Sequence, residues 1–162
     1  MLTNREYADL VKEQLSMLDD DHILKEPCRR STAPCIAYAA WKIKKLDPRA
    51  NMLVTPSDHF VADVEEFRRV VKSSSFVKNS NAILTLGIRP TRPETGYGYI
   101  ETVLGNSNID NREIFRVNSF KEKPTLDLAQ VFIAKSNYYW NSGIFIWNVS
   151  TIVKAFHKYQ SP

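Results

Sequence analysis

The sequence has little cysteine and little glycine, and it has no long hydrophobic run. Its 162 residues include five glycines and two cysteines, Cys28 and Cys35. Two thiols without other soft ligands nearby exclude a structural zinc site, and we expect both to be reduced and semi-buried. No apolar stretch reaches the roughly 20 residues of a membrane-spanning helix. Because the first residues also lack the apolar core of a signal peptide, we expect a cytoplasmic protein without a membrane partner.

Charge of one sign is not concentrated anywhere in the chain. Lysine and arginine number 22 against 18 acidic residues, which gives a formal net charge of +4. No segment combines a basic stripe with aromatic stacking residues, so a nucleic-acid partner is not indicated. We interpret the excess as solvated surface with a few phosphate ligands. The hydrophobic share of 43% is typical of a globular domain with a sizeable core.

Hydrophobic periodicity predicts helices that alternate with strands. Helical spacing of apolar residues predicts helices over 3–15, 32–43, 61–72, 125–135 and 150–159. Short apolar runs predict strands over 22–24, 51–56, 82–88, 99–104, 114–120 and 144–147. The runs 51–56 and 82–88 suit strands buried on both faces, and the helix between them indicates a parallel βαβ unit. The runs 99–104 and 114–120 flank a polar turn, so we expect them to pair as antiparallel strands.

Several ends and faces of these elements carry specific signals. Thr3 and Glu6 fit a capping box, so the first helix should begin there without a strand before it. Thr32 is a candidate N-cap of the second helix. Proline and glycine over 89–99 predict a loop. The helix 125–135 is expected to turn four apolar side chains inward, those of Leu126, Leu128, Val131 and Phe132.

These elements together predict a single α/β domain over residues 1–162. We expect a doubly wound, mostly parallel sheet of the Rossmann-like type, with antiparallel strands added to it. Such a sheet normally opens with a strand and a glycine-rich phosphate loop, and neither precedes the first predicted helix. The sequence therefore predicts a partial domain without its first strand and phosphate loop.

A carboxylate directly follows the strand predicted over 51–56. Asp58 belongs to the segment 56–59, with His59 beside it. In open α/β sheets, ligands bind outside the carboxyl ends of the parallel strands, and carboxylate oxygens suit Mg²⁺. Spacing alone supports an N-cap of the following helix equally well. His59 is more often a structural histidine than a ligand.

Three further segments offer groups for a phosphate or a sugar. In 120–124, Lys123 suits a phosphate and Glu122 suits sugar hydroxyls, although a solvated strand end is the better interpretation of this segment taken alone. The glycines of 95–99 allow a ligand to approach the backbone closely, or they make a tight loop. The segment 141–143 offers hydrogen bonds, or it makes a turn.

Five stretches, collinear and plausibly spaced, share one family resemblance. They are residues 26–34, 55–59, 92–100, 120–124 and 140–147. Together they resemble the sugar-nucleotide pyrophosphorylases, a nucleotidyltransferase family, and most closely its mannose-1-phosphate guanylyltransferase branch. The five stretches cover the chain almost from end to end. Because of this resemblance, we expect Asp58 to bind a metal ion rather than cap a helix. We likewise expect Lys123 to bind a phosphate rather than belong to a solvated strand end.

The resemblance implies a reaction and a set of site residues. The reaction transfers a guanylyl group from GTP to mannose 1-phosphate, gives GDP-mannose and pyrophosphate, and uses Mg²⁺ as cofactor. Asp58 corresponds to the metal-binding aspartate and Lys123 to the lysine on the sugar phosphate, both of them catalytic. Gly98, Glu122 and Asn141 correspond to sugar contacts. A homo-oligomer is compatible with this family.

The resemblance is incomplete around the nucleotide. Arg30, Ser31 and Thr32 resemble part of the wall around the base, where the family more often has asparagine at the position of Ser31. The family's glycine-rich signature loop precedes the first matching stretch, and its second metal-binding aspartate follows the last. The sequence given holds neither, so it resembles an interior fragment that we expect to be nearly inactive alone and prone to self-association. A uridylyl- or thymidylyltransferase and a non-catalytic sugar-phosphate-binding module are the alternatives.

Overall fold

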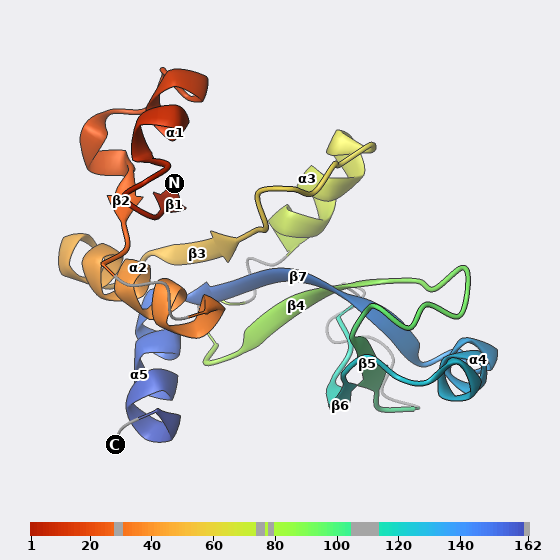
Figure 1. Ribbon diagram of the computed structural model, residues 1–162. Coiled ribbons are helices and arrows are strands. Elements are labelled where there is room, and N and C mark those ends of the chain that lie inside the picture. Colours follow the sequence, from red (N-terminus) through yellow and green to blue (C-terminus); the bar gives the residue numbers. More distant parts are fainter. Residues whose placement is uncertain (28–30, 74–76, 78–79, 105–113, 161–162) are drawn as a thin grey trace. The chain divides into compact units, whose positions relative to one another are not determined.

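Figure 1 shows the computed structural model of the chain, which describes residues 1–27, 31–73, 77, 80–104 and 114–160. The chain divides into two compact units, which are described separately. The first unit comprises Met1–Met52, Lys78–Ile83 and Trp147–Pro162, and the second comprises Leu53–Val77 and Leu84–Ile146. No helix within the described ranges is both long and apolar enough to cross a bilayer.

The first unit begins with a strand, so the expected opening on a helix is wrong. Strand β1 (Leu2–Thr3) pairs in parallel with β2 (Leu24–Lys25), and helix α1 (Ala8–Gln14) and the 3₁₀ helix η1 (Asp20–His22) lie between them in the sequence. Thr3 therefore belongs to a strand and caps nothing. The turn before α1 is fixed instead by Asn4, whose Oδ1 accepts a hydrogen bond from the Tyr7 N–H at 2.9 Å.

Helices α2 (Thr32–Leu46) and α5 (Val149–Tyr159) pack together in the same unit. Both helices are predicted from periodicity and both are confirmed. The N-cap position of α2 is Ser31 rather than Thr32, and its side chain makes no capping hydrogen bond. Cys35 on α2 is a half-buried free thiol, as expected, and burial raises its pKa. Cys28 lies outside the described residues.

The main sheet contains five strands, and its central pairs are antiparallel. The strands are β3 (Asn51–Val54), β4 (Ile83–Ile88), β5 (Tyr99–Thr102), β6 (Val117–Lys121) and β7 (Tyr138–Asn148). Their order is β3-β7-β5-β6, and β4 also pairs with β7. Strand β5 is antiparallel to both of its neighbours, so the mixed α/β class is confirmed but the mostly parallel sheet is wrong.

The long strand β7 explains this correction. The sequence predicts a strand only over 144–147, because Asn141, Ser142 and Gly143 look like a turn. In the structure these residues continue an 11-residue strand in which Gly143 has a φ of +71°. The length of β7 allows β3, β4 and β5 all to pair with it. Strands β3 and β4 are therefore not the buried parallel neighbours expected, and Leu53 and Ile83 are exposed by 43% and 48%.

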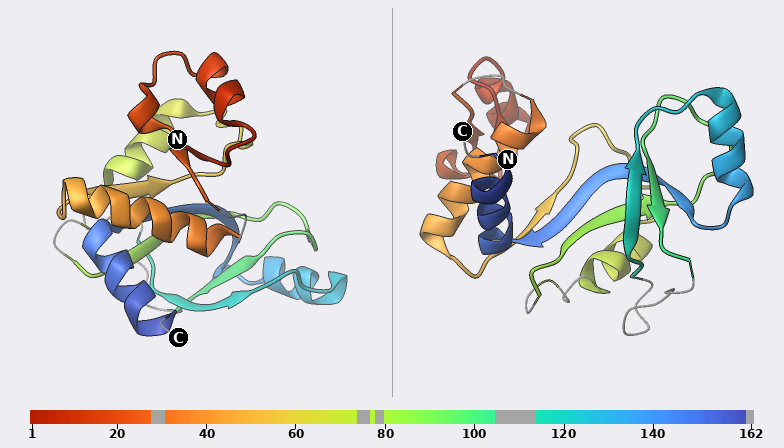
Figure 2. Two further views of the ribbon diagram at one scale, coloured as in Figure 1. Left: turned by 60° about the vertical axis from the view of Figure 1, so that its left-hand side comes forward. Right: turned by 90° about the horizontal axis from the view of Figure 1, so that it is seen from below.

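Helix α4 (Leu126–Ala134), drawn in light blue in Figure 2, contributes to the aromatic core of the second unit. Its inward side chains are Ala129 and Phe132, and Phe132 stacks on Tyr138 with ring centroids 4.4 Å apart. The small Ala129 leaves room for Tyr99, which is fully buried. The expected inward face is wrong for three of its four residues, which are about half exposed: Leu126, Leu128 and Val131. Helix α3 (Val64–Ser73) completes this unit.

Candidate functional site

Three of the residues assigned to the sugar meet at one end of the β6-β5-β7 ladder. The backbone N–H of Asn141 donates to the carbonyl oxygen of Gly98 at 2.8 Å. A Cβ placed on Gly98 would lie 3.1 Å from Oε2 of Glu122 and 3.7 Å from Cβ of Asn141. The second unit thus gathers a backbone position without a side chain, a carboxylate and an amide.

Strand register explains why these three residues meet. Tyr99 on β5 pairs with Lys121 on β6 and with Trp140 on β7. In an antiparallel ladder, one step back along β5 corresponds to one step forward along each neighbour. Position 98 therefore faces 122 on one side and 141 on the other. The grouping is a consequence of antiparallel pairing, which the sequence predicts for β5 with β6 but not for β5 with β7.

The Asn141 side chain is held in a fixed orientation by its neighbours. Its Oδ1 accepts hydrogen bonds from Thr85 Oγ1 at 3.3 Å and from the Gly143 N–H at 3.2 Å. Its Nδ2 has no hydrogen-bond partner among the residues that the structure describes. Sequence reasoning missed Thr85, which lies in an apolar run and bears no ligand signal of its own. The amide therefore presents free N–H donors, as recognition of a hydroxyl requires.

Two predicted site residues have an unusual backbone. In the described parts of the chain, Ser31 and Lys123 are the only non-glycine residues with positive φ, at +75° and +39°. Such conformations cost about 1–3 kcal/mol each and gather at functional sites. Lys123 is exposed two residues after the end of β6, and the buried Pro124 follows it. Lys123 is thus accessible to a ligand, and it directly follows Glu122 in the chain.

Asp58 is exposed on the segment between β3 and α3. It does not cap α3, because Oδ1 of Asp63 accepts the hydrogen bond from the Glu66 N–H at 2.8 Å. The alternative that Asp58 is the helix cap is therefore wrong. Pro56 on the same segment approaches β7, with its Cγ 3.5 Å from where a Cβ of Gly143 would lie. His59 is exposed as well.

The donor set for a metal ion is small. Among the residues that the structure describes, no three His, Cys, Asp or Glu side chains are grouped closely enough to hold an ion. Mg²⁺ keeps several waters and is commonly held by one or two carboxylates together with substrate phosphates. The single exposed carboxylate of Asp58 suits an ion that the protein and the substrate phosphates hold together. It does not suit an ion held by protein ligands alone.

The residues assigned to the nucleotide base belong to the other unit. Ser31 and Thr32 are exposed at the start of α2, and Arg30 lies outside the described residues. Nothing in the described chain tests their role. The site that the structure brings together is therefore the sugar side of the assignment.

A family comparison connects this geometry with known proteins. The family model described as nucleotidyl transferase matches residues 1–161. The chain belongs to this family. A mannose-1-phosphate guanylyltransferase from Escherichia coli is 39% identical, over 99% of this chain and 35% of its own length. The xanthan biosynthesis protein XanB from Xanthomonas campestris is 37% identical, over 99% of this chain and 33% of its own length.

Solved structures agree with this nucleotidyl transferase assignment. The crystal structure described as mannose-1-phosphate geranyltransferase from Thermus thermophilus matches with a TM-score of 0.81 at 29% identity. The match covers 97% of this chain and 44% of that chain. The family resemblance recognised in the sequence is confirmed. This chain spans about a third of the length of the curated relatives it matches.

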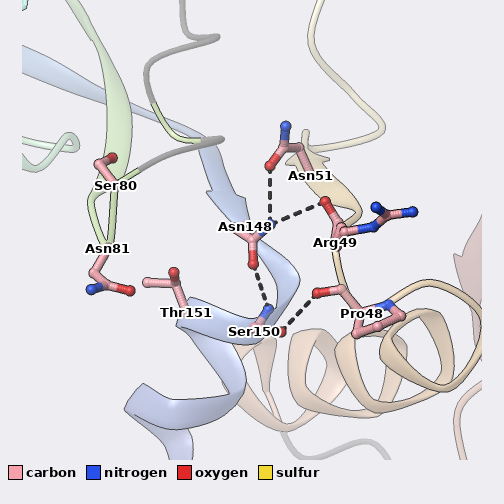
Figure 3. A pocket seen from close by; sticks show the side chains of 8 residues that line it. All are labelled: Pro48, Arg49, Asn51, Ser80, Asn81, Asn148, Ser150 and Thr151. Atoms are coloured by element: carbon pink, nitrogen blue, oxygen red, sulfur yellow. Dashed lines mark hydrogen bonds between the residues drawn. The ribbon is translucent and has the colours of Figure 1, made fainter.

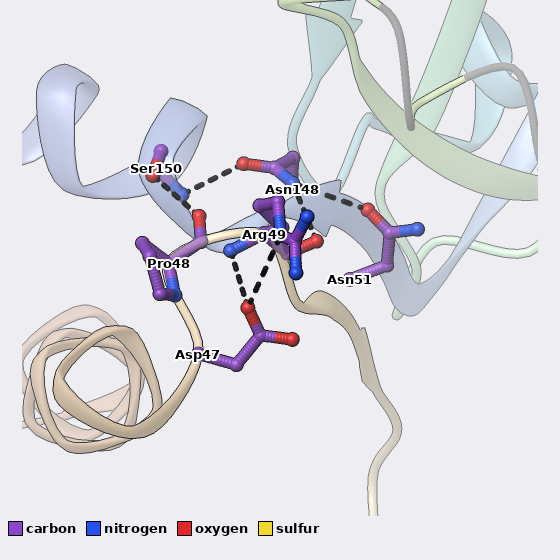
Figure 4. A network of polar contacts seen from close by, with 6 residues as sticks. All are labelled: Asp47, Pro48, Arg49, Asn51, Asn148 and Ser150. Carbon is purple, nitrogen blue, oxygen red and sulfur yellow. Dashed lines mark hydrogen bonds and ion pairs between the residues drawn. The ribbon is translucent and has the colours of Figure 1, made fainter.

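A hollow of about 500 Å³ in the first unit has none of the residues assigned to ligands in its lining (Figure 3). It is lined by Pro48, Arg49, Asn51, Ser80, Asn81, Asn148, Ser150 and Thr151. Asn148 Nδ2 donates to the Arg49 carbonyl at 3.1 Å, and Ser150 Oγ donates to the Pro48 carbonyl at 2.7 Å (Figure 4). These polar groups join the segment before β3 to the start of α5, so we interpret the hollow as structural.

Proposed function

We propose that this chain carries the sugar-phosphate side of a sugar-1-phosphate nucleotidyltransferase site. The proposed reaction transfers a guanylyl group from GTP to mannose 1-phosphate and gives GDP-mannose and pyrophosphate. The observation that carries the proposal is the meeting of Gly98, Glu122 and Asn141 at one end of the ladder, with Lys123 next in the chain. The names of the relatives supply the sugar and the base.

Each group at this end of the ladder has a chemical task in the proposal. The Glu122 carboxylate accepts hydrogen bonds from sugar hydroxyls, and Asn141 Nδ2 donates to one. Gly98 keeps the space beside the carboxylate open, since a Cβ there would come within 3.1 Å of it. A sugar ring bound between these groups is oriented before the reaction begins, which lowers the entropic part of the barrier.

Lys123 acts on the phosphate in this proposal. The sugar phosphate attacks the α-phosphorus of the nucleotide in line, and pyrophosphate leaves. Two phosphate groups repel each other as they approach, and the ammonium of Lys123 reduces that repulsion. Asp58 would supply one oxygen to Mg²⁺ held mainly by the substrates. When bound, such an ion stabilises the charge that develops on the phosphates.

Calorimetric titration of mannose 1-phosphate into the chain tests the proposal. We expect the unmodified chain to bind mannose 1-phosphate. In Glu122→Gln the affinity should fall about tenfold or more, because a hydrogen bond to a charged group contributes about 1.5–3 kcal/mol. Glu65→Gln is the matched control, since Glu65 is an exposed carboxylate on α3 paired with Arg68. Equal affinity in Glu122→Gln, or absence of binding to the unmodified chain, would overturn the proposal.

A pyrophosphate assay separates the neighbouring functions. GTP, UTP and dTTP are each mixed with Mg²⁺ and either mannose 1-phosphate or glucose 1-phosphate. Pyrophosphate release with GTP and mannose 1-phosphate supports guanylyl transfer, whereas release with UTP or dTTP favours the uridylyl or thymidylyl alternative. Because we expect the chain to be nearly inactive alone, sugar-phosphate binding without pyrophosphate release fits both that expectation and a non-catalytic binding module.

A further inference from the structure

The segment between β4 and β5 is anchored on two consecutive aromatic residues of β7. Cζ of Arg89 lies 5.5 Å from the ring centroid of Tyr139, and Cζ of Arg92 lies 5.4 Å from that of Trp140. Successive side chains of a strand point to opposite faces of the sheet. The two arginines therefore contact opposite faces of β7, and the segment that leads to Gly98 begins from a fixed position.

Arg92 makes a second contact that reaches toward Gly98. Its Nη2 lies 3.0 Å from Oε2 of Glu94, and Oε1 of Glu94 accepts the Gly96 N–H at 2.9 Å. The backbone of Glu94 is itself fixed by the buried Tyr99, whose hydroxyl accepts from the Glu94 N–H at 3.1 Å and donates to its carbonyl at 3.0 Å. A continuous set of contacts thus runs from Arg92 to the residues flanking Gly98.

Trp140 is the aromatic residue against which Arg92 lies. Its side chain is buried, and its indole N–H has no acceptor among the described residues. Packing therefore places the ring. The Tyr97 ring lies edge to face with it, with the centroids 5.5 Å apart, and Cζ of Arg92 lies 5.4 Å from the Trp140 centroid. Trp140 precedes Asn141 on β7, and its side chain points to the opposite face of the sheet, so Arg92 acts on the sugar site through the backbone of the 92–98 segment.

We propose that Arg92 is a positioning residue for the sugar site: its stack on Trp140 and its ion pair with Glu94 hold the 92–98 segment so that the Gly98 backbone stays beside Glu122 and Asn141. The consequence for binding rests on the proposed function, whereas the consequence for the segment does not. The role needs arginine, because a planar guanidinium stacks on a ring while it pairs with a carboxylate, and a lysine ammonium cannot reproduce both contacts.

Hydrogen exchange of the Glu94 and Gly96 amides, followed by NMR, tests the structural part. We expect Arg92→Met to speed exchange of both amides about two- to fivefold, the range of an exposed cation–π contact, and Arg92→Lys to give an intermediate change. Arg89→Met is the matched control, because it removes a stack on the opposite face and leaves the Arg92–Glu94 pair in place. Amides of α4 should be unchanged in all three variants, which reports intact folding.

Calorimetry with mannose 1-phosphate tests the functional part on the Arg92 variants. The dissociation constant should rise by a similar factor in Arg92→Met and less in Arg92→Lys, and it should not change in Glu65→Gln, which alters an exposed carboxylate on α3 outside the site. Unchanged exchange in Arg92→Met overturns the inference, and so does faster exchange with unchanged affinity. If the unmodified chain binds no mannose 1-phosphate, the proposed function fails, and the exchange result still decides whether Arg92 fixes the segment.

Discussion

Because residue 98 is a glycine, the Glu122 carboxylate has room beside its backbone. A Cβ there would stand 3.1 Å from Oε2 of Glu122, which is closer than ordinary van der Waals contact, and 3.7 Å from Cβ of Asn141, which is not. Glu122 is exposed and is able to swing away, whereas Asn141 is held by Thr85 and the Gly143 N–H. An added methyl group would therefore displace the carboxylate rather than the amide.

Gly98→Ala is accordingly expected to reduce binding more than stability. The melting temperature should change little, because Gly98 does not have a positive φ and the displaced group is the exposed end of a side chain. Affinity for mannose 1-phosphate should fall about tenfold, the value of one hydrogen bond to a charged group. A thermal melt and a calorimetric titration of the same sample measure the two effects. A large drop in melting temperature with unchanged affinity would contradict this prediction.

The Glu94 carboxylate gives the loop before β5 a dependence on pH. Hydrogen bonding from the Gly96 N–H, and then from Arg92, lowers the pKa of Glu94 below its ordinary value. A carboxyl group with a lowered folded-state pKa contributes its stabilisation above the unfolded pKa and loses it as the pH falls through the folded pKa. We therefore expect the Gly96 amide to lose protection only in acid, below about pH 4.

An NMR titration of the Glu94 side-chain carboxyl carbon measures this directly. Its midpoint should lie below the ordinary value of about 4.3 for a glutamate and should move toward it in Arg92→Met. A midpoint for Glu94 that Arg92→Met leaves unchanged would show that the ion pair does not form in solution.

At the scale of elements, local signals predicted the helices and the β5–β6 pair. Each of these rests on a periodicity or a turn that lies within one stretch of sequence. The sequence predicts β7 only over 144–147, and its first part escaped prediction because Asn141, Ser142 and Gly143 are polar or small and because Gly143 has a positive φ inside the strand. The inward face of α4 was predicted wrongly because its most buried residue, Ala129, is less hydrophobic than the exposed Leu126, Leu128 and Val131.

The start of α5 depends on one side chain. Oδ1 of Asn148 accepts from the Ser150 N–H at 2.9 Å, and its Nδ2 donates to the Arg49 carbonyl at 3.1 Å. Asn148→Ala removes the helix cap and this link, so the free energy of unfolding should fall by about 0.5–2 kcal/mol. Urea denaturation measures the change, and Asn81→Ala, which alters an exposed asparagine at the same hollow, should have little effect.

At the scale of the whole molecule, the family resemblance assigned residues to a sugar side but did not indicate how they meet. Five collinear stretches led to Asp58, Gly98, Glu122, Lys123 and Asn141, all of which lie in the second unit. The grouping of Gly98, Glu122 and Asn141 depends on long-range register between β5, β6 and β7, and no single stretch of sequence contains that information. The roles of these residues, the Mg²⁺ ion and the base contacts stay predictions.

The β5–β6 pair has two ends, and only one of them faces the proposed ligand. Gly98 and Glu122 lie where the pair is open, while the connection between the strands leaves β5 after Thr102 and enters β6 at Val117. Changes in the length of that connection leave the register at the open end untouched. Insertions there are free to accumulate during divergence or to carry an engineered tag, whereas one residue added within β5 would move Gly98 out of line with both of its partners.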